Sequence, residues 1–307
     1  MKILLTGGSG MVGRNVAEHL AGSSKELIAP ASSEMNLLDP LSTLEYIRFV
    51  RPDVIIHAAG RVGGIQANMA APVSFLSENW DMGRNIMLAA REAGVTRLLN
   101  LGSSCMYPKN SPEALKEEDI LSGTLEPTNE GYAIAKCAVA KLGGYISAED
   151  PRFQYKTLVP CNLYGRYDKF DPAHSHLVPA VIRKLHHAKI NSQESVDIWG
   201  DGSARREFMY AGDLADAILR GIDHYETLPA LMNVGLGHDH SVNDYYRIAA
   251  EVVGYAGRFD HDLSKPVGMM RKLTDVTRAS DWGWKFKTSL EDGLRAAYSY
   301  YLETGAL

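Results

Sequence analysis

The sequence has few cysteines and no apolar stretch long enough to cross a membrane. Its three cysteines, Cys105, Cys137 and Cys161, contain no CxxC pair, and their odd number excludes a complete disulfide framework. The apolar start of the chain is too short for the core of a signal peptide. These absences predict a protein of a reducing compartment, the cytoplasm, that is not held in a membrane.

An excess of positive charge is also missing. The chain of 307 residues has 32 Lys and Arg against 37 Asp and Glu, a formal net charge of -5. Its basic residues are scattered, so neither nucleic acid nor an anionic membrane is an expected partner. A hydrophobic content of 45% and a charged content of 22% are ordinary for a soluble globular protein, and no linker rich in Gly, Ser or Pro divides the chain.

Short apolar runs alternate with longer segments of helical period in the first half, as in a parallel sheet wrapped by helices. The expected strands are 2–6, 26–30, 54–57, 97–101 and 156–160, and the expected helices are 11–21, 41–50, 73–93 and 131–147. We therefore predict the α/β class, with a Rossmann-type doubly wound parallel sheet over residues 1–163. Residues 164–307 are predicted to form mainly a smaller C-terminal α/β substrate lobe, from which some segments return to the first domain.

The stretch GGSGMVG follows the first expected strand and opens the first expected helix. It satisfies GxGxxG from Gly8 and the looser GxxGxxG from Gly7. Glycines in this context allow a tight turn and a close backbone approach, so that a pyrophosphate sits on free N–H groups at the helix N-terminus. The motif predicts a dinucleotide site. Its expected residues are Gly7, Gly8, Ser9, Gly10, Met11, Val12 and Gly13.

The end of the second strand leaves the choice between NAD and NADP open. An acidic residue there binds a ribose 2′-hydroxyl, whereas an arginine nearby binds a 2′-phosphate. Ser32 and Ser33 can donate to a phosphate, Glu34 can accept from a ribose, and Arg14 can reach across from the first helix. The small residues of HAAG, 57–60, either let the cofactor lie flat or serve strand–helix packing.

Tyr132 and Lys136 stand four residues apart and project from one face of the helix expected at 131–147. A lysine ammonium beside a phenol lowers the tyrosine pKa from about 10, which makes the phenol a usable proton donor or acceptor. Ser103 follows the fourth strand, and the C-terminal ends of parallel strands converge on the ligand crevice. A Ser-Tyr-Lys triad of this kind moves a hydride between a nicotinamide and a carbon that bears oxygen.

Further motifs are spread over nearly the whole chain: AAGRVGGIQAN, LGSSCMYPK, GTLEPTNEGYAIAK, NLYGRYDKF, SHLVPAVIR, WGDGSARREF, NVGLG and SKPVGMMRKLTDVTR. They resemble the extended short-chain dehydrogenases/reductases, and within them the GDP-L-fucose synthases, which are 3,5-epimerase-4-reductases of GDP-4-keto-6-deoxy-D-mannose. The resemblance implies that Cys105 and His176 exchange protons at carbons 3 and 5, which the ketone at carbon 4 acidifies. A thiol pKa of about 8.5 and an imidazole pKa of about 6.5 bracket neutral pH, so each group can lend or take a proton. Ser103 and Tyr132 would hold the oxygen at carbon 4, which Tyr132 then protonates as hydride arrives.

The resemblance also implies a GDP-linked 4-keto sugar as substrate, NADP(H) as the favoured cofactor with NAD as the alternative, and a homodimer. The implied substrate-binding residues are Asn162, Lys184, Trp199, Arg206 and Lys272. Beyond the glycine-rich loop, the implied cofactor-binding residues are Ser32, Ser33, Asn36, Leu37, Ala58, Ala59, Leu101, Gly102, Ser104, Lys136, Pro160, Asn162, Leu163 and His176.

The chain departs from this family pattern in four places. It lacks the arginines common at 30–33, which grip a 2′-phosphate, and has Ser9 where arginine is frequent. Residues 210–213, Tyr-Ala-Gly-Asp, replace His-Val-Asp-Asp, and Cys161 replaces threonine. The alternative functions are therefore action on another GDP-4-keto sugar of the colitose or heptose type, a C4 reductase without epimerisation, and a sugar-nucleotide 4-epimerase. A cofactor-sensing binding protein is a further alternative, against which the intact triad argues.

Simpler structural roles stay open for single residues. Cys105 can be a small buried filler, and Trp199 can be ordinary core. His174 and His176 form an HxH pair, but no pair of cysteines or carboxylates at ligand spacing accompanies them, so no metal site is expected.

Overall fold

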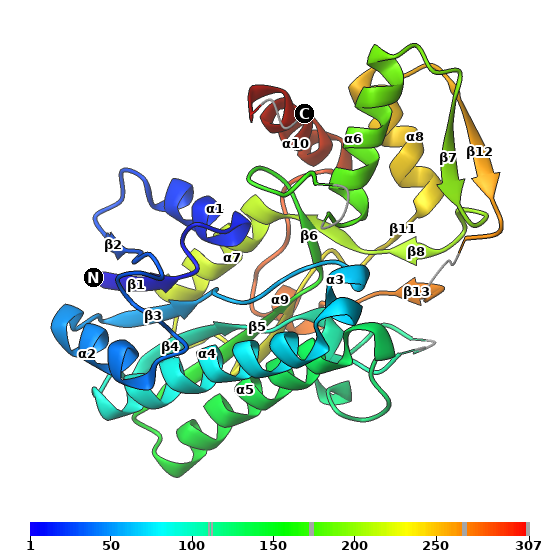
Figure 1. The fold of residues 1–307 in the computed structure, drawn as a ribbon. Coiled ribbons are helices and arrows are strands. Elements are labelled where there is room, and N and C mark those ends of the chain that lie inside the picture. Colours follow the sequence, from blue (N-terminus) through cyan, green and yellow to red (C-terminus); the bar gives the residue numbers. More distant parts are fainter. Residues whose placement is uncertain (110, 112, 172–174, 266–268, 305–307) are drawn as a thin grey trace.

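A six-stranded parallel sheet forms the centre of the protein in the computed structural model, which describes residues 1–109, 111, 113–171, 175–265 and 269–304 (Figure 1). The strands are β1 (Lys2–Thr6), β2 (Glu26–Ile28), β3 (Val54–His57), β4 (Arg97–Leu101), β5 (Gln154–Pro160) and β10 (Leu231–Val234). Their order in space is β10-β5-β4-β3-β1-β2, so the chain starts inside the sheet and winds outward to both edges.

Helices cover both faces of this sheet because its strands are apolar on both sides. The helices of one face are α1 (Met11–Leu20) and α7 (Ala211–Asp223), and those of the other are α2 (Pro40–Val50), α4 (Pro72–Glu92) and α5 (Glu130–Glu149). On β1, Ile3 and Leu5 belong to the core under α1 and α7, whereas Leu4 belongs to the core under α2 and α4. Successive strand residues point to opposite faces, so one short strand serves two cores.

The predicted Rossmann-type architecture is confirmed, with small shifts at the ends of the elements. The strand predicted at 26–30 ends at Ile28, because Pro30 has no N–H with which to continue the ladder. The helix α3 (Ile65–Ala70) was not predicted, since six residues are too few to display a helical period.

The edge strand β10 returns to the sheet from residues far beyond 163. It pairs with β5, in the register Leu231 with Thr157. The core under α1 and α7 also contains Met209, Ala279 and Trp284. Residues beyond 163 therefore complete both the sheet and its core, while the exact division of the chain at 163 and 164 stays a prediction.

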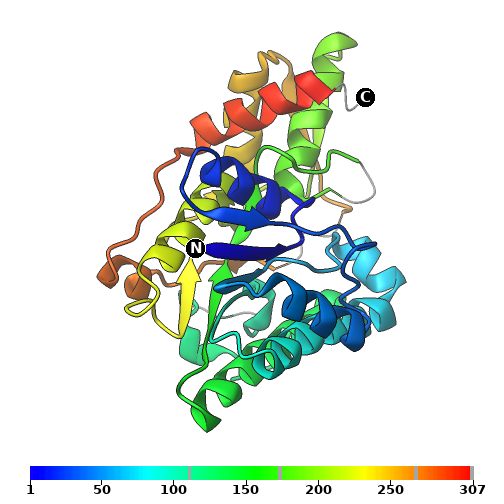
Figure 2. The ribbon, with the colours of Figure 1, turned by 90° about the vertical axis from the view of Figure 1, so that its left-hand side faces the viewer.

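The remaining elements form a second lobe with its own core, which includes Tyr164, Ile198, Tyr245 and Leu294. Its helices, which Figure 2 shows side by side above the sheet, are α6 (Leu177–Ile190), α8 (Val242–Val253) and α10 (Leu290–Thr304). Its strands pair as β6 (Asn162–Tyr164) with β9 (Phe208–Tyr210), β7 (Ser195–Trp199) with β12 (Arg258–Asp262), and β8 (Arg205–Arg206) with β11 (His240–Ser241) and β13 (Arg271–Lys272). Connections between elements contain η1 (Ser104–Met106), η2 (Glu117–Asp119), η3 (Pro127–Asn129) and α9 (Thr277–Asp281).

Of the helices in the described ranges, none has both the length and the apolar character needed to cross a membrane. The cytoplasmic location inferred from the sequence stays a prediction.

Candidate active site

The glycine-rich turn between β1 and α1 fits a dinucleotide pyrophosphate. Gly7 has a φ of 73°, and a Cβ there would lie 2.7 Å from the backbone of Ala58. A Cβ on Gly13 would lie 2.3 Å from the carbonyl oxygen of Gly7, so only glycine lets α1 start this close to β1. α1 begins at Met11 after Gly10, a residue that has no side chain with which to cap the helix. The first N–H groups of α1 are thus available to an anion.

The segment after β2 carries the residues predicted at the adenosine ribose. Ser32 and Ser33 are exposed, and the Glu34 carboxylate accepts a hydrogen bond of 2.7 Å from a backbone N–H three residues earlier. Arg14 holds its guanidinium 3.7 Å from the centroid of the Tyr167 ring. The segment itself contains no Lys or Arg, so a 2′-phosphate here would be met by hydroxyl donors rather than by a guanidinium fork.

The C-terminal edge of the sheet gathers the other residues predicted at the cofactor. His57, at the end of β3, bonds through Nδ1 to the hydroxyl oxygen of Thr6 at 2.8 Å, and burial lowers its pKa to about 3. This histidine is therefore a neutral packing residue, and the small residues after it face Gly7. The predicted cofactor residues along this edge or just beyond it are Asn36, Leu37, Ala58, Ala59, Leu101, Gly102, Ser104, Pro160, Asn162 and Leu163.

The turn η1 places Cys105 directly after β4. The hydroxyl oxygen of Ser103 accepts a hydrogen bond of 3.2 Å from the N–H of Cys105 and so caps this turn. The N–H of Gly102 donates to the carbonyl of Leu158 at 2.8 Å, which continues the contact between β4 and β5 beyond the strand end. The backbone of Cys105 is thereby fixed at the ligand edge of the sheet.

Tyr132 and Lys136 project from α5 toward η1. The Ser103 hydroxyl lies close enough to the Tyr132 phenol to act on its pKa. The Nζ of Lys136 donates to the carbonyl of Leu101 at 2.9 Å and lies 5.8 Å from the centroid of the Tyr132 ring. The structure thus brings together the three side chains of the predicted triad.

Burial governs the protonation of this triad. Burial raises the pKa of Tyr132, the charge of Cys105 adds to the rise, and the Ser103 hydroxyl opposes it. Burial lowers the pKa of Lys136 from 10.5 to about 8, against the effect of Cys105. The prediction that Lys136 lowers the pKa of Tyr132 is therefore wrong for this arrangement. The neutral phenol is the stable form, which suits Tyr132 as a proton donor.

Two donors flank the sulfur of Cys105. Asn129, at the end of η3, places its Nδ2 3.2 Å from the Cys105 Sγ, and Lys272 on β13 places its Nζ 3.8 Å from the same atom. His176 precedes α6, and burial lowers the pKa of its imidazole, so the ring is neutral near pH 7. A meeting of Cys105 and His176 across one sugar ring stays a prediction. His174 lies outside the described residues, and so does any HxH pair.

The residues predicted to bind the nucleotide sugar come from separate segments of the second lobe. Arg206 on β8 and Lys272 on β13 are partners in register on neighbouring parallel strands, so their side chains leave the same face of this small sheet. Trp199, at the end of β7, is exposed. Lys184 on α6 forms an ion pair of 2.7 Å with Asp197 two residues before Trp199, so α6 and β7 bring these predicted residues close together.

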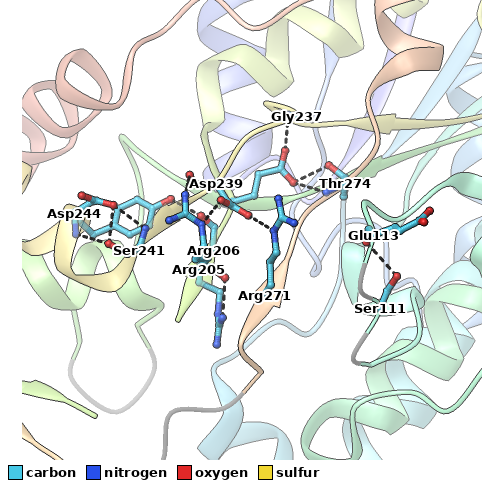
Figure 3. A network of polar contacts seen from close by, with 12 residues as sticks. Ser111, Glu113, Arg205, Arg206, Gly237, Asp239, Ser241, Asp244, Arg271 and Thr274 are labelled. Carbon is cyan, nitrogen blue, oxygen red and sulfur yellow. Dashed lines mark hydrogen bonds and ion pairs between the residues drawn. The ribbon is translucent and has the colours of Figure 1, made fainter. Parts of the chain in front are cut away.

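One buried carboxylate fixes the register of β8 and β13 (Figure 3). Asp239, whose side chain is only 4% exposed, accepts from the Nε of Arg205 at 2.5 Å and from the Nε of Arg271 at 2.6 Å. Burial alone would raise the pKa of Asp239, but the hydrogen bonds from the two arginines hold it below its usual range. Arg205 and Arg271 directly precede Arg206 and Lys272, so the two pairs lie on opposite faces of the small sheet. The Asp239 clamp, which holds Arg205 and Arg271 on one face, therefore sets the positions of Arg206 and Lys272 on the other face.

A second buried carboxylate, that of Glu207, anchors the neighbouring loop. Its oxygens accept from the N–H groups of Leu236 and Gly237 and from the N–H and hydroxyl of Thr274, at distances of 2.6 to 3.0 Å. The Nδ2 of Asn162 donates to the Glu207 carbonyl at 3.2 Å. The start of β6 is thus connected directly to the residue that follows Arg206.

The sequence pattern of the NAD dependent epimerase/dehydratase family matches residues 3–235. The chain belongs to this family. Its relatives include the GDP-L-colitose synthase of Yersinia pseudotuberculosis, 52% identical over 98% of each chain. The GDP-L-fucose synthase of Azorhizobium caulinodans is 50% identical, over 98% of this chain and 96% of that one. The predicted resemblance to GDP-L-fucose synthases is therefore confirmed.

Solved structures of GDP-sugar reductases have a similar fold. A GDP-6-OMe-4-keto-L-xylo-heptose reductase from C. jejuni superposes with a TM-score of 0.92 at 27% identity, covering 99% of this chain and 98% of that one. A GDP-mannoheptose C4 reductase from Campylobacter jejuni, solved with NADP bound, has a TM-score of 0.90 at 27% identity over 98% of each chain. The fit of the glycine-rich turn and these neighbours together support a nicotinamide cofactor.

Sequence reasoning missed four residues that shape the site: Asn129, Glu207, Asp239 and Arg271. Asn129 stands three residues before Tyr132, and Glu207 and Arg271 are sequence neighbours of Arg206 and Lys272. Adjacency to predicted residues was the available signal. It does not reveal which carboxylate meets which donor, because that depends on the pairing of strands far apart in the chain.

Proposed function

We propose that this protein is a GDP-sugar epimerase-reductase that converts GDP-4-keto-6-deoxy-D-mannose to GDP-L-fucose. One observation carries the proposal: η1, which holds Cys105, packs against α5, which holds Tyr132 and Lys136, and the Nδ2 of Asn129 directly before α5 lies 3.2 Å from the Cys105 Sγ. The residues of a hydride-transfer triad and a proton-exchanging thiol therefore lie together at one site. The GDP-L-fucose synthase of Azorhizobium caulinodans, 50% identical, supports the choice of sugar nucleotide.

The epimerisation needs one proton acceptor and one proton donor on opposite faces of the ring. The carbonyl at carbon 4 acidifies carbons 3 and 5, and Ser103 and Tyr132 hydrogen-bond the oxygen on which the enolate charge develops. A neutral His176 can accept a proton while the Cys105 thiol donates one. The hydrogens on carbons 3 and 5 lie on the same face of the ring, so both inversions run in the same direction, and each leaves the two groups with exchanged protonation states. Proton exchange with solvent restores the starting states after each inversion, which closes the proton balance and lets solvent deuterium enter at both carbons.

The reduction uses the same oxygen contacts. The nicotinamide, when bound, supplies the hydride for carbon 4. Tyr132 donates its proton to the carbon 4 oxygen, and its raised pKa keeps that proton in place until negative charge develops there. Lys136, with a pKa of about 8, can return a proton to the Tyr132 phenolate, or its positive charge can stabilise that phenolate.

We propose NADPH as the physiological reductant, with weak discrimination against NADH. A structural neighbour carries NADP, which supports NADPH. The segment after β2 offers the hydroxyls of Ser32 and Ser33 but no guanidinium, and it places the Glu34 carboxylate close by. Hydroxyl donors bind a 2′-phosphate more weakly than a bidentate arginine does. Titration of nicotinamide fluorescence with the two reduced cofactors should give dissociation constants within about tenfold of each other.

The second candidate function is the conversion of a GDP-linked ketosugar to GDP-L-colitose. The 52% identity to a GDP-L-colitose synthase supports this candidate. Colitose has no hydroxyl at carbon 3, so only carbon 5 would be inverted. A single inversion leaves Cys105 and His176 with exchanged protons, and the starting state then has to be restored by proton exchange with solvent. Stereochemistry at carbon 3 therefore separates the two candidates.

The deciding experiment is turnover in deuterium oxide. GDP-4-keto-6-deoxy-D-mannose and the corresponding 3-deoxy ketosugar are incubated with NADPH, the cofactor absorbance is followed, and the product is identified by NMR. The first candidate predicts deuterium at carbons 3 and 5 and an L-sugar product. Cys105→Ser and His176→Asn should each slow this exchange strongly, and unchanged exchange in both variants would contradict their assignment.

We also propose that the protein is a homodimer joined through α4 and α5. These two helices pack against each other, and they expose large apolar side chains: Val73, Leu76, Leu88, Ile134 and Tyr145. Light scattering after gel filtration should give twice the mass of 33.7 kDa. The double variant Val73→Glu and Tyr145→Glu should give the monomer mass, and a monomeric wild-type protein would contradict the proposal.

A further inference from the structure

Asn129 lies against Cys105 but has no part in the steps described above. Its Nδ2 is 3.2 Å from the Cys105 Sγ, which is short for a contact to an atom as large as sulfur. The Oδ1 of the same amide is buried and has no hydrogen-bond partner in the described part of the chain. A buried acceptor left open costs about 1–3 kcal/mol, and folded proteins leave few of them. Both ends of this amide therefore need an explanation.

The position of Asn129 in the chain associates it with the triad. Asn129, Tyr132 and Lys136 are spaced by three and four residues where η3 runs into α5, and such spacings put side chains on one helix face. The N–H of Asn129 donates to the carbonyl of Glu126 at 3.2 Å, which fixes the turn. The start of α5 therefore supplies three groups of the site: the Asn129 amide that lies beside the sulfur, the Tyr132 phenol and the Lys136 ammonium.

We propose that Asn129 is a positioning residue for Cys105 and a specificity contact for the sugar. Its amide N–H holds the sulfur and stabilises the thiolate, and its Oδ1 accepts a hydrogen bond from a hydroxyl of the hexose ring. The proposal rests on the function proposed above. Cys105 passes through the thiolate whichever inversion comes first, so a donor on Sγ lowers the cost of that state in both. The amide N and O of Asn129 belong to one planar group, so the Oδ1 that lacks a partner among the described residues lies near the Cys105 sulfur. It therefore stands beside the sugar ring on which Cys105 is proposed to act.

Other groups act on the charge of Cys105 as well. Lys272, from β13, places its Nζ 3.8 Å from Sγ. Tyr132, Lys136 and Cys137, all on α5, interact electrostatically with Cys105. A test of Asn129 therefore has to change its amide alone and leave these groups in place.

The first test titrates the thiol without any sugar nucleotide. The rate of alkylation by iodoacetamide is measured from pH 6 to pH 10, with Cys105→Ser as the blank; burial raises the pKa of Cys137 and Cys161, which keeps them unreactive. Asn129→Ala should raise the midpoint by about half a unit, and Asn129→Asp by about one unit or more, because a carboxylate replaces the donor. Asn191→Asp, at an exposed amide bonded to its own helix, is the matched control and should leave the midpoint unchanged.

The second test separates the two ends of the amide during turnover of GDP-4-keto-6-deoxy-D-mannose. Asn129→Asp keeps an acceptor oxygen, so its KM should stay within about threefold of wild type while kcat for deuterium incorporation falls about tenfold. Asn129→Ala loses both ends, and its KM should also rise about five- to tenfold. Circular dichroism confirms that both variants are folded.

Each part of the proposal has a result that overturns it. An unchanged thiol midpoint in both folded variants overturns the positioning role of Asn129. Equal KM values in Asn129→Ala and Asn129→Asp overturn the sugar contact. If the wild-type protein turns over no GDP-linked ketosugar, the proposed function and the sugar contact both fail, while the alkylation profile still decides whether Asn129 holds the sulfur.

Discussion

The two ends of the candidate site are built in different ways. At the glycine-rich turn, the groups proposed to bind the cofactor are backbone N–H groups of one continuous segment, and packing leaves room only for hydrogen atoms on Gly7 and Gly13. At the end proposed to bind the sugar nucleotide, here called the sugar end, Arg206 and Lys272 come from strands distant in sequence, and the Asp239 carboxylate on the opposite face aligns them. The first end is fixed by steric exclusion and the second by charge. The two ends should therefore fail differently when they are altered.

The largest effect is expected where the two ends meet, at Tyr132. Tyr132→Phe removes the proton donor, and we expect the rate of NADPH oxidation with the ketosugar to fall at least a thousandfold, within the usual range for general acid catalysis of about 10²–10⁴. Cofactor affinity, measured by nicotinamide fluorescence, should be unchanged because the glycine-rich turn is untouched. A variant with wild-type turnover would remove Tyr132 from the hydride step.

Gly13→Ala tests steric exclusion at the cofactor end. The added Cβ would lie 2.3 Å from the Gly7 carbonyl, so the start of α1 has to move away from β1. We expect the dissociation constant for NADPH to rise about a hundredfold and the free energy of unfolding to fall by about 2–3 kcal/mol. Gly144→Ala is the matched control: it lies exposed on α5 with no atom within 4 Å of its Cβ, and it should stabilise the protein by about 0.5–1 kcal/mol. Equal effects at the two glycines would contradict the steric argument.

Lys136→Met tests the burial of charge between the two ends. The pKa of Lys136 is lowered from 10.5 to about 8, so between these values the unfolded chain binds more protons than the folded protein. The contribution of Lys136 to the free energy of unfolding therefore rises with pH between these two pKa values, by up to about 1.4 kcal/mol per pH unit. Below the lower pKa this contribution is constant. From pH 7.5 to pH 10.5 the wild-type protein should gain about 3 kcal/mol relative to Lys136→Met in urea unfolding. A difference that does not depend on pH would show that Lys136 keeps an ordinary pKa.

Asp239→Asn tests the charge clamp at the sugar end, with the smallest expected effect. Arg205 and Arg271 lose their buried partner, and we expect the free energy of unfolding to fall by about 1–3 kcal/mol and the KM for the GDP-linked sugar to rise about tenfold. The dissociation constant for NADPH should not change. The control is Asp260→Asn, which breaks an exposed ion pair with Arg258 and should cost less than about 0.5 kcal/mol. Loss of cofactor affinity in Asp239→Asn would mean that the two ends are not independent.

The cofactor end could be predicted from the sequence because its determinants are local. GGSGMVG contains both the turn and the start of the helix, and the apolar runs before and after it place them in a parallel sheet. Ser103 could be placed near Tyr132 because the C-terminal ends of parallel strands share one edge. The structure brings these two side chains close enough for Ser103 to act on the pKa of Tyr132.

The sugar end could not be predicted in the same way. Arg205, Asp239 and Arg271 meet only because β8 and β13 pair in one particular register, and two-residue strands leave no periodic signal. The protonation of the triad was misjudged for a related reason. The expected effect of Lys136 on the pKa of Tyr132 was inferred from a spacing of four residues, whereas the pKa is raised mainly by burial, which depends on everything packed around α5.

The place of β10 in the chain has a consequence for biosynthesis. A nascent polypeptide that has emerged as far as residue 163 possesses five strands of the central sheet, but the outer edge of β5 is still bare. Asn233, which bonds with Tyr107 and Glu117, has not yet been synthesised at that stage. An unprotected edge of this kind pairs readily with other chains. The ribosome therefore has to complete most of the second lobe before the first can close, and a gene cut after codon 163 should yield an aggregating product.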